Sequence, residues 1–405
     1  MTILMLVKEK FPTIRPMLIE LWNHEIQNRD HKLIWIMQTE QPAWKIRIHN
    51  WNGSRVYLLP AFPSKNSITQ MANLAVTLIG KGFFATYLML RERIDHVHVH
   101  DGVEEGIIAL FLKRIFGQPY TYGYTFPMHR HVQQPPDSTG WRHYLKLIYN
   151  RFRGWGYRVV LQQAARVFPI SKALGDLLEQ ELNIPTHRLL PVGECASETF
   201  LTVGRNHDYK PHREQVSLIY VGSLGPWRNI PFIIDCFDHL WLEHPHVQLY
   251  LLGWGEYPTD IPALQRYIYQ KRSAESIHFV GKVPYETVPE IVTTCDIGLS
   301  PIPPSELFRV ATPTKCIEYL ALKLPVVANR EIEEQKKILE ASQGGILTAY
   351  NRTEFTEALC LLVEDEHRRI TCAQKGFEWI QTHRTFKQMA VTIDQTLTQL
   401  KTGSS

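Results

Sequence analysis

Short apolar runs alternate with helix-period segments along the whole chain, and this alternation predicts an α/β protein. In the first half, the apolar runs predict strands over 3–7, 33–37, 55–59, 96–100, 119–124 and 166–170. The pattern restarts at 216–222 and predicts further strands over 247–252, 277–280, 297–300 and 325–328. Helices are predicted between these strands, over 230–242, 260–273, 285–294, 314–323 and 331–342. Strands that alternate with helices in this way form parallel sheets with helices on both faces.

A polar, unpatterned segment divides the alternation into two parts. We predict an N-terminal domain over 1–201, a linker over 202–213, a C-terminal domain over 214–384 and a last helical segment over 385–405 that crosses back to the first domain. Both domains are expected to be Rossmann-like and doubly wound. If they face each other across a cleft, the carboxyl ends of both sheets meet there, where such sheets bind ligands.

Composition places the chain among ordinary soluble proteins. It is 44% hydrophobic and 21% charged, and no apolar run approaches the roughly 20 residues that span a bilayer. The apolar run at the N-terminus is too short for a signal peptide, so we expect a cytoplasmic protein. The six cysteines are scattered without a C-x-x-C pair, which disfavours a zinc site and a disulfide framework.

Charge is distributed unevenly between the two halves. Residues 1–200 carry 23 basic and 16 acidic side chains, a net charge of +7, which leaves 21 against 24, or −3, for the remainder. The segment 138–175 contains no acidic residue, and 141–158 interleaves Arg and Lys with Trp, Tyr and Phe. Such a segment suits an anionic membrane surface or, equally, a basic helix with its aromatic side chains in the core. Nucleic acid is a weaker interpretation, because no nucleic-acid-binding module is evident.

The segment Thr312-Pro313-Thr314-Lys315-Cys316-Ile317-Glu318 has the composition of an anion-binding helix start. Thr312 is a suitable N-cap and Pro313 a suitable first helical residue. The amides of Thr314, Lys315 and Cys316 would then be free to bind a diphosphate, and Lys315 adds a positive charge. Glu318, one turn later, can accept hydrogen bonds from ribose hydroxyls. Taken alone, the segment would be better interpreted as a plain helix start with an acid in its first turn. Here strands are predicted on both sides of it, over 297–300 and 325–328, which places it at the crevice beyond the strand ends.

Further motifs follow in order and make a family resemblance visible. They are Tyr220-Val221-Gly222-Ser223-Leu224 with Arg228-Asn229, Leu252-Gly253-Trp254-Gly255-Glu256, Phe279-Val280-Gly281-Lys282-Val283-Pro284, Asp296-Ile297-Gly298-Leu299-Ser300-Pro301 and Pro313-x-Lys315-x-x-Glu318-Tyr319. This second half resembles family 4 glycosyltransferases of the GT-B fold. The first half resembles them more loosely, through His98-Val99-His100-Asp101 and Val167-Phe168-Pro169-Ile170-Ser171-Lys172.

The resemblance implies roles for residues of the second half. Arg228 and Lys315 would hold the donor diphosphate and stabilise the departing nucleotide, so that no metal or other cofactor is required. Glu318 would bind ribose, and residues Gly222, Gly253, Gly255 and Val283 would enclose the donor.

Two positions depart from the family pattern. Val310 stands where many members have a first Glu, and Glu306 is the candidate to compensate for it in contacting the sugar. Ser223 replaces the usual basic residue after the strand, and we expect Lys315 to supply the lost charge.

Acceptor-side candidates lie near predicted strand ends in the first half. They are His100, Asp101, His129 and His131, and Thr125 competes with His129 for the position of an acceptor-side catalytic group.

The resemblance implies a retaining hexosyltransferase that uses a UDP- or GDP-sugar and an acceptor hydroxyl. If 141–158 meets a membrane, the acceptor is expected to be a lipid-linked saccharide in cell-surface polysaccharide synthesis, and the enzyme to be peripheral on the inner face of the plasma membrane. The alternatives are a sugar-nucleotide epimerase on the same fold and a non-catalytic, glycosyltransferase-like partner protein.

Overall fold

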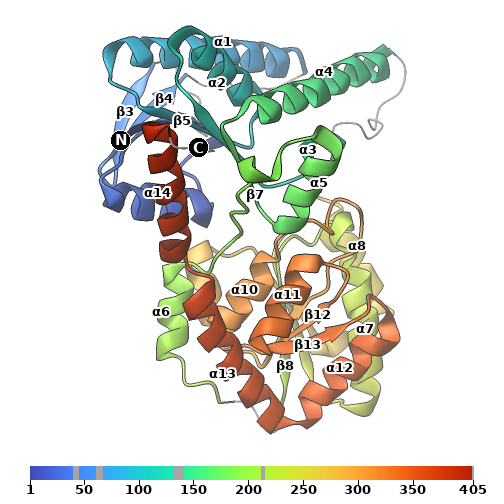
Figure 1. The fold of residues 1–405 in the computed structure, drawn as a ribbon. Helices are drawn as coiled ribbons and strands as arrows, with labels where there is room; N and C mark the ends of the chain where they lie inside the picture. The colour runs from blue at the N-terminus through green and yellow to red at the C-terminus, as the bar shows by residue number, and fades with distance from the viewer. Residues whose placement is uncertain (40–44, 61–66, 132–140, 211–214, 404–405) are drawn as a thin grey trace. The chain divides into compact units, whose positions relative to one another are not determined.

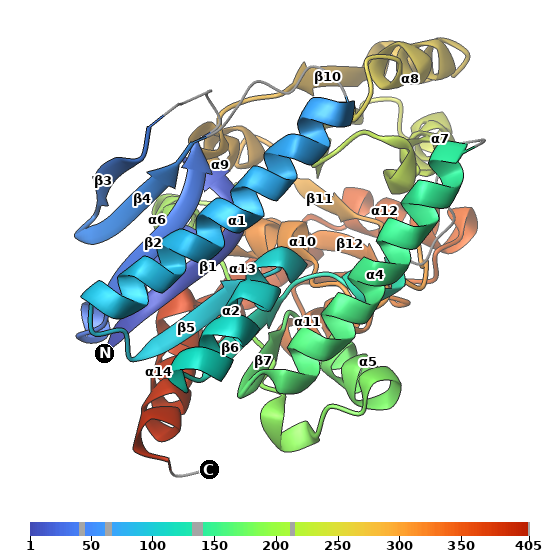
Figure 2. The same ribbon diagram turned by 90° about the horizontal axis from the view of Figure 1, so that it is seen from above.

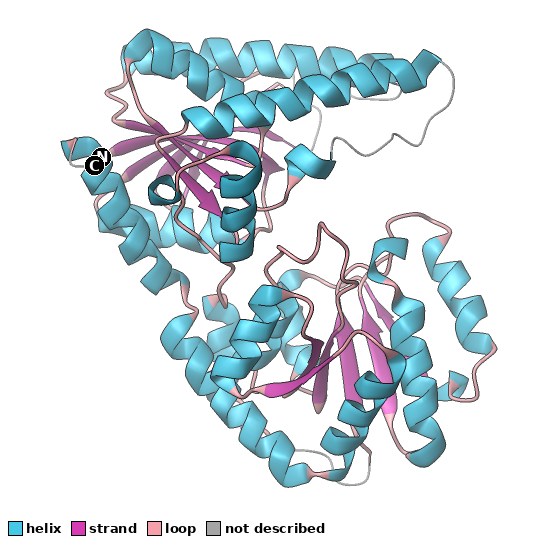
Figure 3. Ribbon diagram, turned by 45° about the vertical axis from the view of Figure 1, so that its right-hand side comes forward, coloured by secondary structure: helices cyan, strands magenta, loops and turns pink. Residues whose placement is uncertain are grey.

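The computed structural model describes residues 1–39, 45–60, 67–131, 141–210 and 215–403. The chain forms two compact units, one comprising Met1–Gly193 with Phe386–Ser405 and the other Glu194–Thr385. Each unit contains one sheet with helices on both faces (Figures 1 and 3). The predicted α/β fold class is confirmed for both units. Among the described residues, no helix combines the length and apolar composition needed to cross a membrane.

The first unit contains a sheet of order β3-β4-β2-β1-β5-β6-β7. Its strands are β1 (Thr2–Phe11), β2 (Lys32–Thr39), β3 (Arg47–Trp51), β4 (Ser54–Leu59), β5 (His96–His100), β6 (Tyr120–Tyr124) and β7 (Arg166–Pro169). Its helical segments are η1 (Met17–Ile26), η2 (Gln27–Arg29), α1 (Ser67–Arg91), α2 (Val103–Phe116), α3 (Met128–His131), α4 (Trp141–Gln163), α5 (Lys172–Leu182), η3 (Thr186–Arg188) and α14 (Phe386–Thr402). All strand pairs are parallel except the edge pair β3–β4, and β3 was not predicted.

The alternation of His and Val in β5 assigns its side chains to the two faces of this sheet. All five residues are buried, and successive side chains of a strand point to opposite faces. On the histidine face, the His98 ring stacks on Trp22 of η1, with ring centroids 3.9 Å apart. Thr121 of β6 hydrogen-bonds both His98 Nδ1 (2.9 Å) and His96 Nε2 (3.0 Å). Burial lowers the pKa of His96 to about 3, so the ring is neutral and compatible with the core.

Helix α14 packs on η1 in the first unit. Its Asp394 contacts His31 Nε2 at 2.8 Å, and its Lys401 lies 3.8 Å from Asp95. The chain therefore leaves the first unit after Gly193 and returns to it at Phe386.

The second unit contains a six-stranded parallel sheet of order β10-β9-β8-β11-β12-β13. Its strands are β8 (Ser217–Val221), β9 (Gln248–Leu252), β10 (Ile277–Gly281), β11 (Ile297–Ser300), β12 (Val326–Asn329) and β13 (Gly345–Thr348). Its helical segments are α6 (Glu198–Asn206), η4 (Pro226–Arg228), α7 (Ile230–Glu243), α8 (Asp260–Tyr269), η5 (Ala274–Ser276), η6 (Tyr285–Thr287), α9 (Val288–Val292), α10 (Thr314–Ala321), α11 (Glu333–Ser342), α12 (Arg352–Glu364) and α13 (Glu366–His383).

Strand β8 divides the core of the second unit. Its Leu218 and Tyr220 pack in one cluster with residues of α7, α8 and α12. Ile219 points to the other face and packs with residues of α6, α10, α11 and α13. Both faces of the strand are therefore buried, as a parallel sheet covered by helices requires.

The structure differs from the predicted elements at several places. Residues 202–206 of the predicted linker belong to α6, because Ser197 caps this helix and Phe200 and Leu201 are buried; residues 211–214 lie outside the described part. The helix predicted over 285–294 is divided into η6 and α9. Strand β13 and helices α12 and α13 were not predicted.

Close packing of α6 on α10 yields a stability prediction. A Cβ added to Gly204 would lie 1.9 Å from the carbonyl oxygen of Ala321 and 3.0 Å from Cε2 of Phe377. We expect Gly204→Ala to lower the free energy of unfolding of the second unit by about 1–3 kcal/mol, because the helices must separate. Urea denaturation followed by fluorescence measures this change. Gly80→Ala in α1 is the control, since its added methyl group meets no atom within 4 Å; equal losses in both variants would contradict the packing argument.

Candidate functional site

The second unit has its topological switch point between β8 and β11. From β8 the sheet continues through β9 to β10, and from β11 it continues the other way through β12 to β13. The loops that follow these two strands therefore diverge and leave a crevice at the carboxyl ends, where open α/β sheets bind ligands. Residues Gly222–Asn229, after β8, and Pro301–Pro313, after β11, form these loops.

Two glycines bring the loops after β8 and β9 into close contact. Gly253 has φ +156°, and a Cβ there would lie 1.7 Å from the carbonyl oxygen of Gly222. Gly222, with φ +143°, donates its amide to the carbonyl of Leu252 at 2.9 Å. A Cβ on Gly222 would lie 3.6 Å from Nζ of Lys315. Both glycines have φ values that other residues rarely adopt, and the Lys315 side chain lies close to Gly222 at the end of β8.

Lys315 is a partly buried cation at the first turn of α10. Its Nζ lies 3.3 Å from the hydroxyl oxygen of Tyr220 and 4.5 Å from the centroid of that ring. Burial, followed by repulsion from Arg228, lowers the pKa of Lys315 to about 7. Among the described residues, neither Lys315 nor Arg228 forms an ion pair with a carboxylate. An anionic ligand would therefore relieve the unfavourable burial of both charges.

Arg228 ends the short helix η4 and lies in the same crevice. Its guanidinium carbon is 5.0 Å from the ring centroid of Phe308, in the loop after β11. The next residue, Asn229, has φ +48° and donates from Nδ2 to the hydroxyl of Tyr350 at 3.1 Å. The chain thus turns sharply after Arg228 into α7, and the turn directs the loop after β8 toward the loop after β11.

The start of α10 differs from the prediction by one residue. Helix α10 begins at Thr314, and Pro313 is the N-cap without a side-chain capping bond. Thr312 is therefore not the N-cap, and the amide of Thr314 is not free, because it donates to the carbonyl of Thr312 at 3.1 Å. The amides of Lys315 and Cys316 stay available within the described structure. The Cys316 thiol itself is buried, and burial raises its pKa to about 12.

Glu318 lies one turn beyond Lys315 and is partly buried. Tyr285 donates its hydroxyl to Glu318 Oε1 at 2.9 Å. Burial is the main cause that raises the pKa of Glu318 to about 7. Tyr285 thus orients the carboxylate, a role that sequence reasoning missed because Tyr285 is distant in sequence and belongs to no quoted motif.

The remaining predicted donor residues are placed around this crevice with different exposure. Glu306 is exposed in the loop after β11, and Val310 is partly buried in the same loop. Ser223 donates its hydroxyl to Glu256 at 2.8 Å. Gly255 lies against Asp260, whose carboxylate caps the amides of Glu256 and Tyr257; Val283 packs on the core cluster around α10.

In the first unit, a polar cluster lies at the carboxyl ends of β1, β5 and β6. Asp101 has φ +59° and accepts the amide of Thr125 at 2.8 Å; the Thr125 hydroxyl also contacts it. Arg15 lies 3.5 Å from Asp101 and 3.2 Å from Glu9. The His100 ring is buried, and among the described residues neither ring nitrogen has a hydrogen-bond partner. The predicted residues His100, Asp101 and Thr125 thus lie in one cluster. Glu9 and Arg15, which were not predicted, belong to the same cluster.

Strand β1 explains why Glu9 and Arg15 were missed. The predicted strand 3–7 extends to Phe11, with an irregularity between Leu6 and Lys10. Glu9 therefore belongs to the strand end at the switch point between β1 and β5. Ligand atoms of Glu9, His100 and Asp101 lie within 4.8 Å of one another, but Arg15 already places a cation between the two carboxylates.

The structure gives His129 a different environment from the one expected of an acceptor-side catalytic base. Its ring is buried, with Nδ1 2.8 Å from the Tyr124 hydroxyl and Nε2 3.0 Å from Glu181. Burial lowers the pKa of His129, and Glu181 opposes this shift. Both ring nitrogens are thus engaged within the protein. His131 is exposed, with its ring 5.9 Å from that of Phe126.

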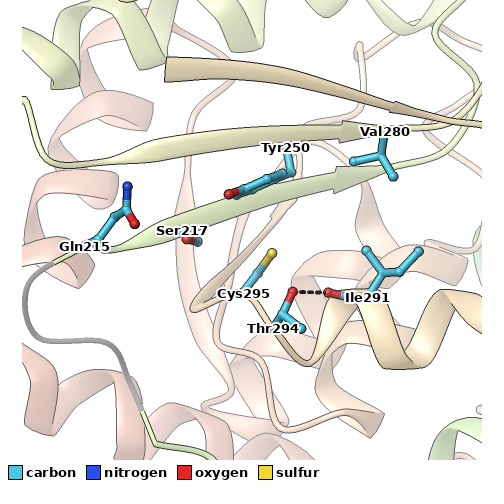
Figure 4. A pocket seen from close by; sticks show the side chains of 7 residues that line it. All are labelled: Gln215, Ser217, Tyr250, Val280, Ile291, Thr294 and Cys295. Carbon is cyan, nitrogen blue, oxygen red and sulfur yellow. Dashed lines mark hydrogen bonds between the residues drawn. The ribbon is translucent and has the colours of Figure 1, made fainter. Parts of the chain in front are cut away.

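A pocket of about 330 Å³ occurs elsewhere in the second unit (Figure 4). It is lined by Gln215, Ser217, Tyr250, Val280, Ile291, Thr294 and Cys295. Ser217 begins β8, whereas Gly222 follows the last residue of that strand. No lining side chain is charged, and burial raises the pKa of the Cys295 thiol to about 12. The pocket therefore lacks groups that would neutralise a phosphate.

Comparison with known proteins assigns the chain to a family. Residues 215–365 match the family model described as Glycosyl transferases group 1, and residues 25–193 match that of a Glycosyl transferase 4-like domain. The two matches together cover most of the chain. The protein therefore belongs to the group 1 glycosyltransferases of the family 4 type and is a glycosyltransferase. Among curated protein sequences, no relative matches.

Solved structures show the same GT-B fold over the whole chain. Sucrose-phosphate synthase from Thermosynechococcus elongatus matches with a TM-score of 0.73 and 16% identity, covering 100% of both chains. HepE from Anabaena in complex with UDP and glucose matches with a TM-score of 0.68 and 15% identity, covering 98% of this chain and 99% of that chain. A UDP-forming alpha,alpha-trehalose-phosphate synthase from Burkholderia xenovorans matches with a TM-score of 0.71 and 9% identity, covering 98% of this chain and 100% of that chain.

Proposed function

We propose that this glycosyltransferase transfers a sugar from a UDP- or GDP-sugar to a hydroxyl of a lipid-linked saccharide, with retention of the anomeric configuration. One observation carries the donor side of the proposal. Lys315 and Arg228, two partly buried cations without a carboxylate partner among the described residues, converge where β8 and α10 meet. A nucleotide diphosphate supplies the negative charge that this arrangement lacks.

Uridine is the first base to test. The related HepE structure contains UDP and glucose, and the related trehalose-phosphate synthase is described as UDP-forming. In this chain, Glu318 would accept hydrogen bonds from the ribose hydroxyls while Tyr285 holds its other side. The sugar itself would lie toward the loop that contains Glu306 and Val310.

The proposed reaction needs little acid–base chemistry from the protein. The acceptor oxygen forms a bond to the anomeric carbon on the face from which the diphosphate departs. The bond between that carbon and the diphosphate oxygen breaks, and the acceptor proton passes to a departing phosphate oxygen. Lys315, Arg228 and the α10 amides stabilise the charge that develops on the leaving group. These groups compensate the charge in the proposed mechanism without a metal ion.

The polar cluster of the first unit is the proposed acceptor site. The His100 ring forms no hydrogen bond among the described residues, although its Nε2 lies 3.9 Å from Asp101 Oδ2. The ring and the Asp101 carboxylate, which Thr125 fixes, would offer hydrogen-bonding groups to a sugar hydroxyl. His129, through its bond to the Tyr124 hydroxyl, is assigned a positioning role in place of the catalytic one predicted. A lipid-linked acceptor in polysaccharide synthesis would place the enzyme at the inner face of the plasma membrane.

A panel of nucleotide sugars tests the proposal. We expect UDP-glucose or a related UDP-sugar to raise the thermal stability of the protein, by about 2.7 kcal/mol at a hundred times its Kd, and to serve as donor for a polyprenyl-diphosphate sugar. GDP-mannose tests the other base. If no UDP- or GDP-sugar stabilises the protein, the donor site is wrong. Isomerisation of the nucleotide sugar in the absence of an acceptor would indicate an epimerase.

Donor affinity should depend on pH with a maximum near neutrality. Lys315 must be charged and Glu318 ionised to bind diphosphate and ribose, and the pKa of each is about 7 in the free protein. Above pH 7 Lys315 loses its proton, and below pH 7 Glu318 gains one. The Kd for UDP-glucose should therefore rise about tenfold per pH unit on either side.

Calorimetric titrations from about pH 5 to about pH 9 measure this profile. Lys315→Arg should flatten the alkaline limb, because arginine stays protonated throughout this range. Glu318→Gln should flatten the acid limb. A profile that is unchanged in both variants would contradict the assignment of the two groups.

A further inference from the structure

Helix α1 presents an apolar face to solvent. Its only buried charge, Lys81, points inward, donates to the carbonyl of Val7 at 2.9 Å and pairs with Glu105 of α2. The outward positions carry Ile79, Phe83, Tyr87 and Leu90, of which Phe83 is 75% and Leu90 73% exposed. A helix that covers a sheet normally shows the opposite arrangement, with its polar side outward.

Two neighbouring helices extend this apolar surface. Helix α2 packs against both α1 and α4, and the three lie side by side on one face of the sheet of the first unit (Figure 2). On α2, Phe111 and Ile115 are exposed. On α4, the exposed apolar side chains are Tyr144, Leu147, Ile148, Tyr149, Phe152 and Trp155. The side chains of 141–143, 145 and 146 lie outside the described residues. We call this surface the α1–α2–α4 face.

The exposed charges of this face have one sign. Among the described residues of the three helices, the exposed charged side chains are Arg91, Arg114, Arg151 and Arg158. The acidic residues are not exposed: Glu105 is buried with Lys81, and Glu104 is partly covered and lies 3.5 Å from Arg153. The sequence interpretation that placed the α4 aromatic residues in the core holds for Tyr157, which is buried, but not for Phe152 or Trp155.

We propose that the α1–α2–α4 face docks on the surface of an anionic lipid bilayer. Exposed aliphatic and aromatic side chains would enter the interfacial region of the bilayer, where tryptophan and tyrosine are favoured. The four arginines would contact anionic headgroups, with their aliphatic stems along the apolar surface. Docking would therefore use the hydrophobic and the electrostatic contribution together.

The charge pattern favours a bilayer over a second copy of the chain. A symmetric dimer through this face would bring the same patch of both copies together and oppose arginines with arginines. An anionic bilayer supplies the opposite charge over an extended surface. The aliphatic side chains of Ile79, Leu90, Ile115 and Ile148 would not stack on nucleic-acid bases, as aromatic side chains do.

Docking would also bring the proposed acceptor site near the bilayer. Helix α2 begins at Val103, two residues after Asp101. Tyr157 of α4 donates its hydroxyl to the carbonyl of Asp101 at 3.2 Å. The acceptor cluster thus lies at one end of the docking face, as a lipid-linked acceptor requires. Only this last point rests on the proposed function; the docking itself does not.

Vesicle co-sedimentation of the full chain tests the proposal. We expect binding to phosphatidylcholine vesicles with about 30 mol% phosphatidylglycerol and at least about tenfold weaker binding to pure phosphatidylcholine. The triple variant Phe83→Ser, Phe152→Ser, Trp155→Ser should bind the anionic vesicles at least about tenfold more weakly. Replacing the four arginines by glutamine should remove the preference for anionic lipid.

Matched controls separate docking from folding and from donor binding. The triple variant Leu242→Ser, Tyr269→Ser, Leu361→Ser changes three exposed apolar side chains of the second unit and should bind vesicles like the wild type. Stabilisation by UDP-glucose, retained in the docking variants, shows that they are folded and reports on the donor site separately. Absence of vesicle binding by the wild-type protein overturns the proposal. So does a dimer, seen by light scattering, that the Phe83, Phe152, Trp155 variant abolishes while vesicle binding is unchanged.

Discussion

Lys315→Met is expected to lower kcat/KM for sugar transfer by about a hundredfold or more, the size seen when one preorganised group at a developing charge is removed. The methionine side chain retains the length of lysine but loses the charge that lies over Gly222 and beside Tyr220. Arg228→Met should have an effect of similar size. The double variant should lose less than the product of the two effects, because both cations act on the same diphosphate.

Steady-state kinetics with a UDP-sugar donor measure these effects. Lys336→Met, which alters a partly exposed lysine on α11 of the same unit, is the matched control and should leave kcat/KM unchanged. If the Lys315→Met variant turned over at the wild-type rate, Lys315 would not supply the charge of the basic residue that the family has at the position of Ser223. Ser223 itself is directed to Glu256 and carries no charge.

Glu318→Ala is expected to raise the Kd for UDP about 10- to 100-fold, because the ribose would lose hydrogen bonds to a charged acceptor. The substitution should weaken donor binding and leave kcat nearly unchanged, because the ribose is remote from the bond that breaks. Tyr285→Phe should have a smaller effect in the same direction, because it only releases the carboxylate held at 2.9 Å.

Isothermal titration with UDP distinguishes these variants. Glu286→Ala removes an exposed carboxylate next to Tyr285 and is the matched control. Equal affinities for the wild type and Glu318→Ala would show that the ribose lies elsewhere. Unchanged KM together with a large loss of kcat would assign Glu318 to the chemical step instead.

The sequence was sufficient to predict most of the architecture because strand and helix periodicity are local signals. The strands β8 to β12 agree with their predicted positions to within two residues. Strand β13 was missed because Gly345-Ile346-Leu347-Thr348 is short and its neighbours are not strongly apolar. The polar composition of 202–213 hid α6, whose helix depends on packing of Phe200 and Leu201 and on its Ser197 cap.

The donor motif could be recognised in the sequence because its residues are close together. The side chains that contact them are distant in sequence and could not be predicted. Lys315 and Glu318 belong to one helical turn, but Tyr220 is 95 residues from Lys315 and Tyr285 is 33 residues from Glu318. The partners of His129 were equally hidden from the sequence. Its position after β6 indicated an acceptor-side residue, but its second ring nitrogen bonds Glu181, 52 residues away. Only the folded chain shows that both nitrogens are engaged.

The sequence could not show which side chains of α1 are exposed to solvent. The helix is apolar on nearly all sides, so periodicity does not show which side packs on the sheet. The structure places Lys81 inside and Phe83 outside. The sequence did indicate that α4 is basic and aromatic. That the exposed apolar surface of α4 continues over α1 and α2 could be seen only from the arrangement of the three helices.

A crystal structure of the complex with UDP would show directly which residues hold the diphosphate and the ribose. We expect the β-phosphate to lie within hydrogen-bonding distance of Lys315 Nζ, the Arg228 guanidinium and the amides of Lys315 or Cys316, and the ribose hydroxyls to bind Glu318. UDP bound elsewhere, for example in the pocket beside Cys295, with Lys315 still on Tyr220, would contradict this expectation.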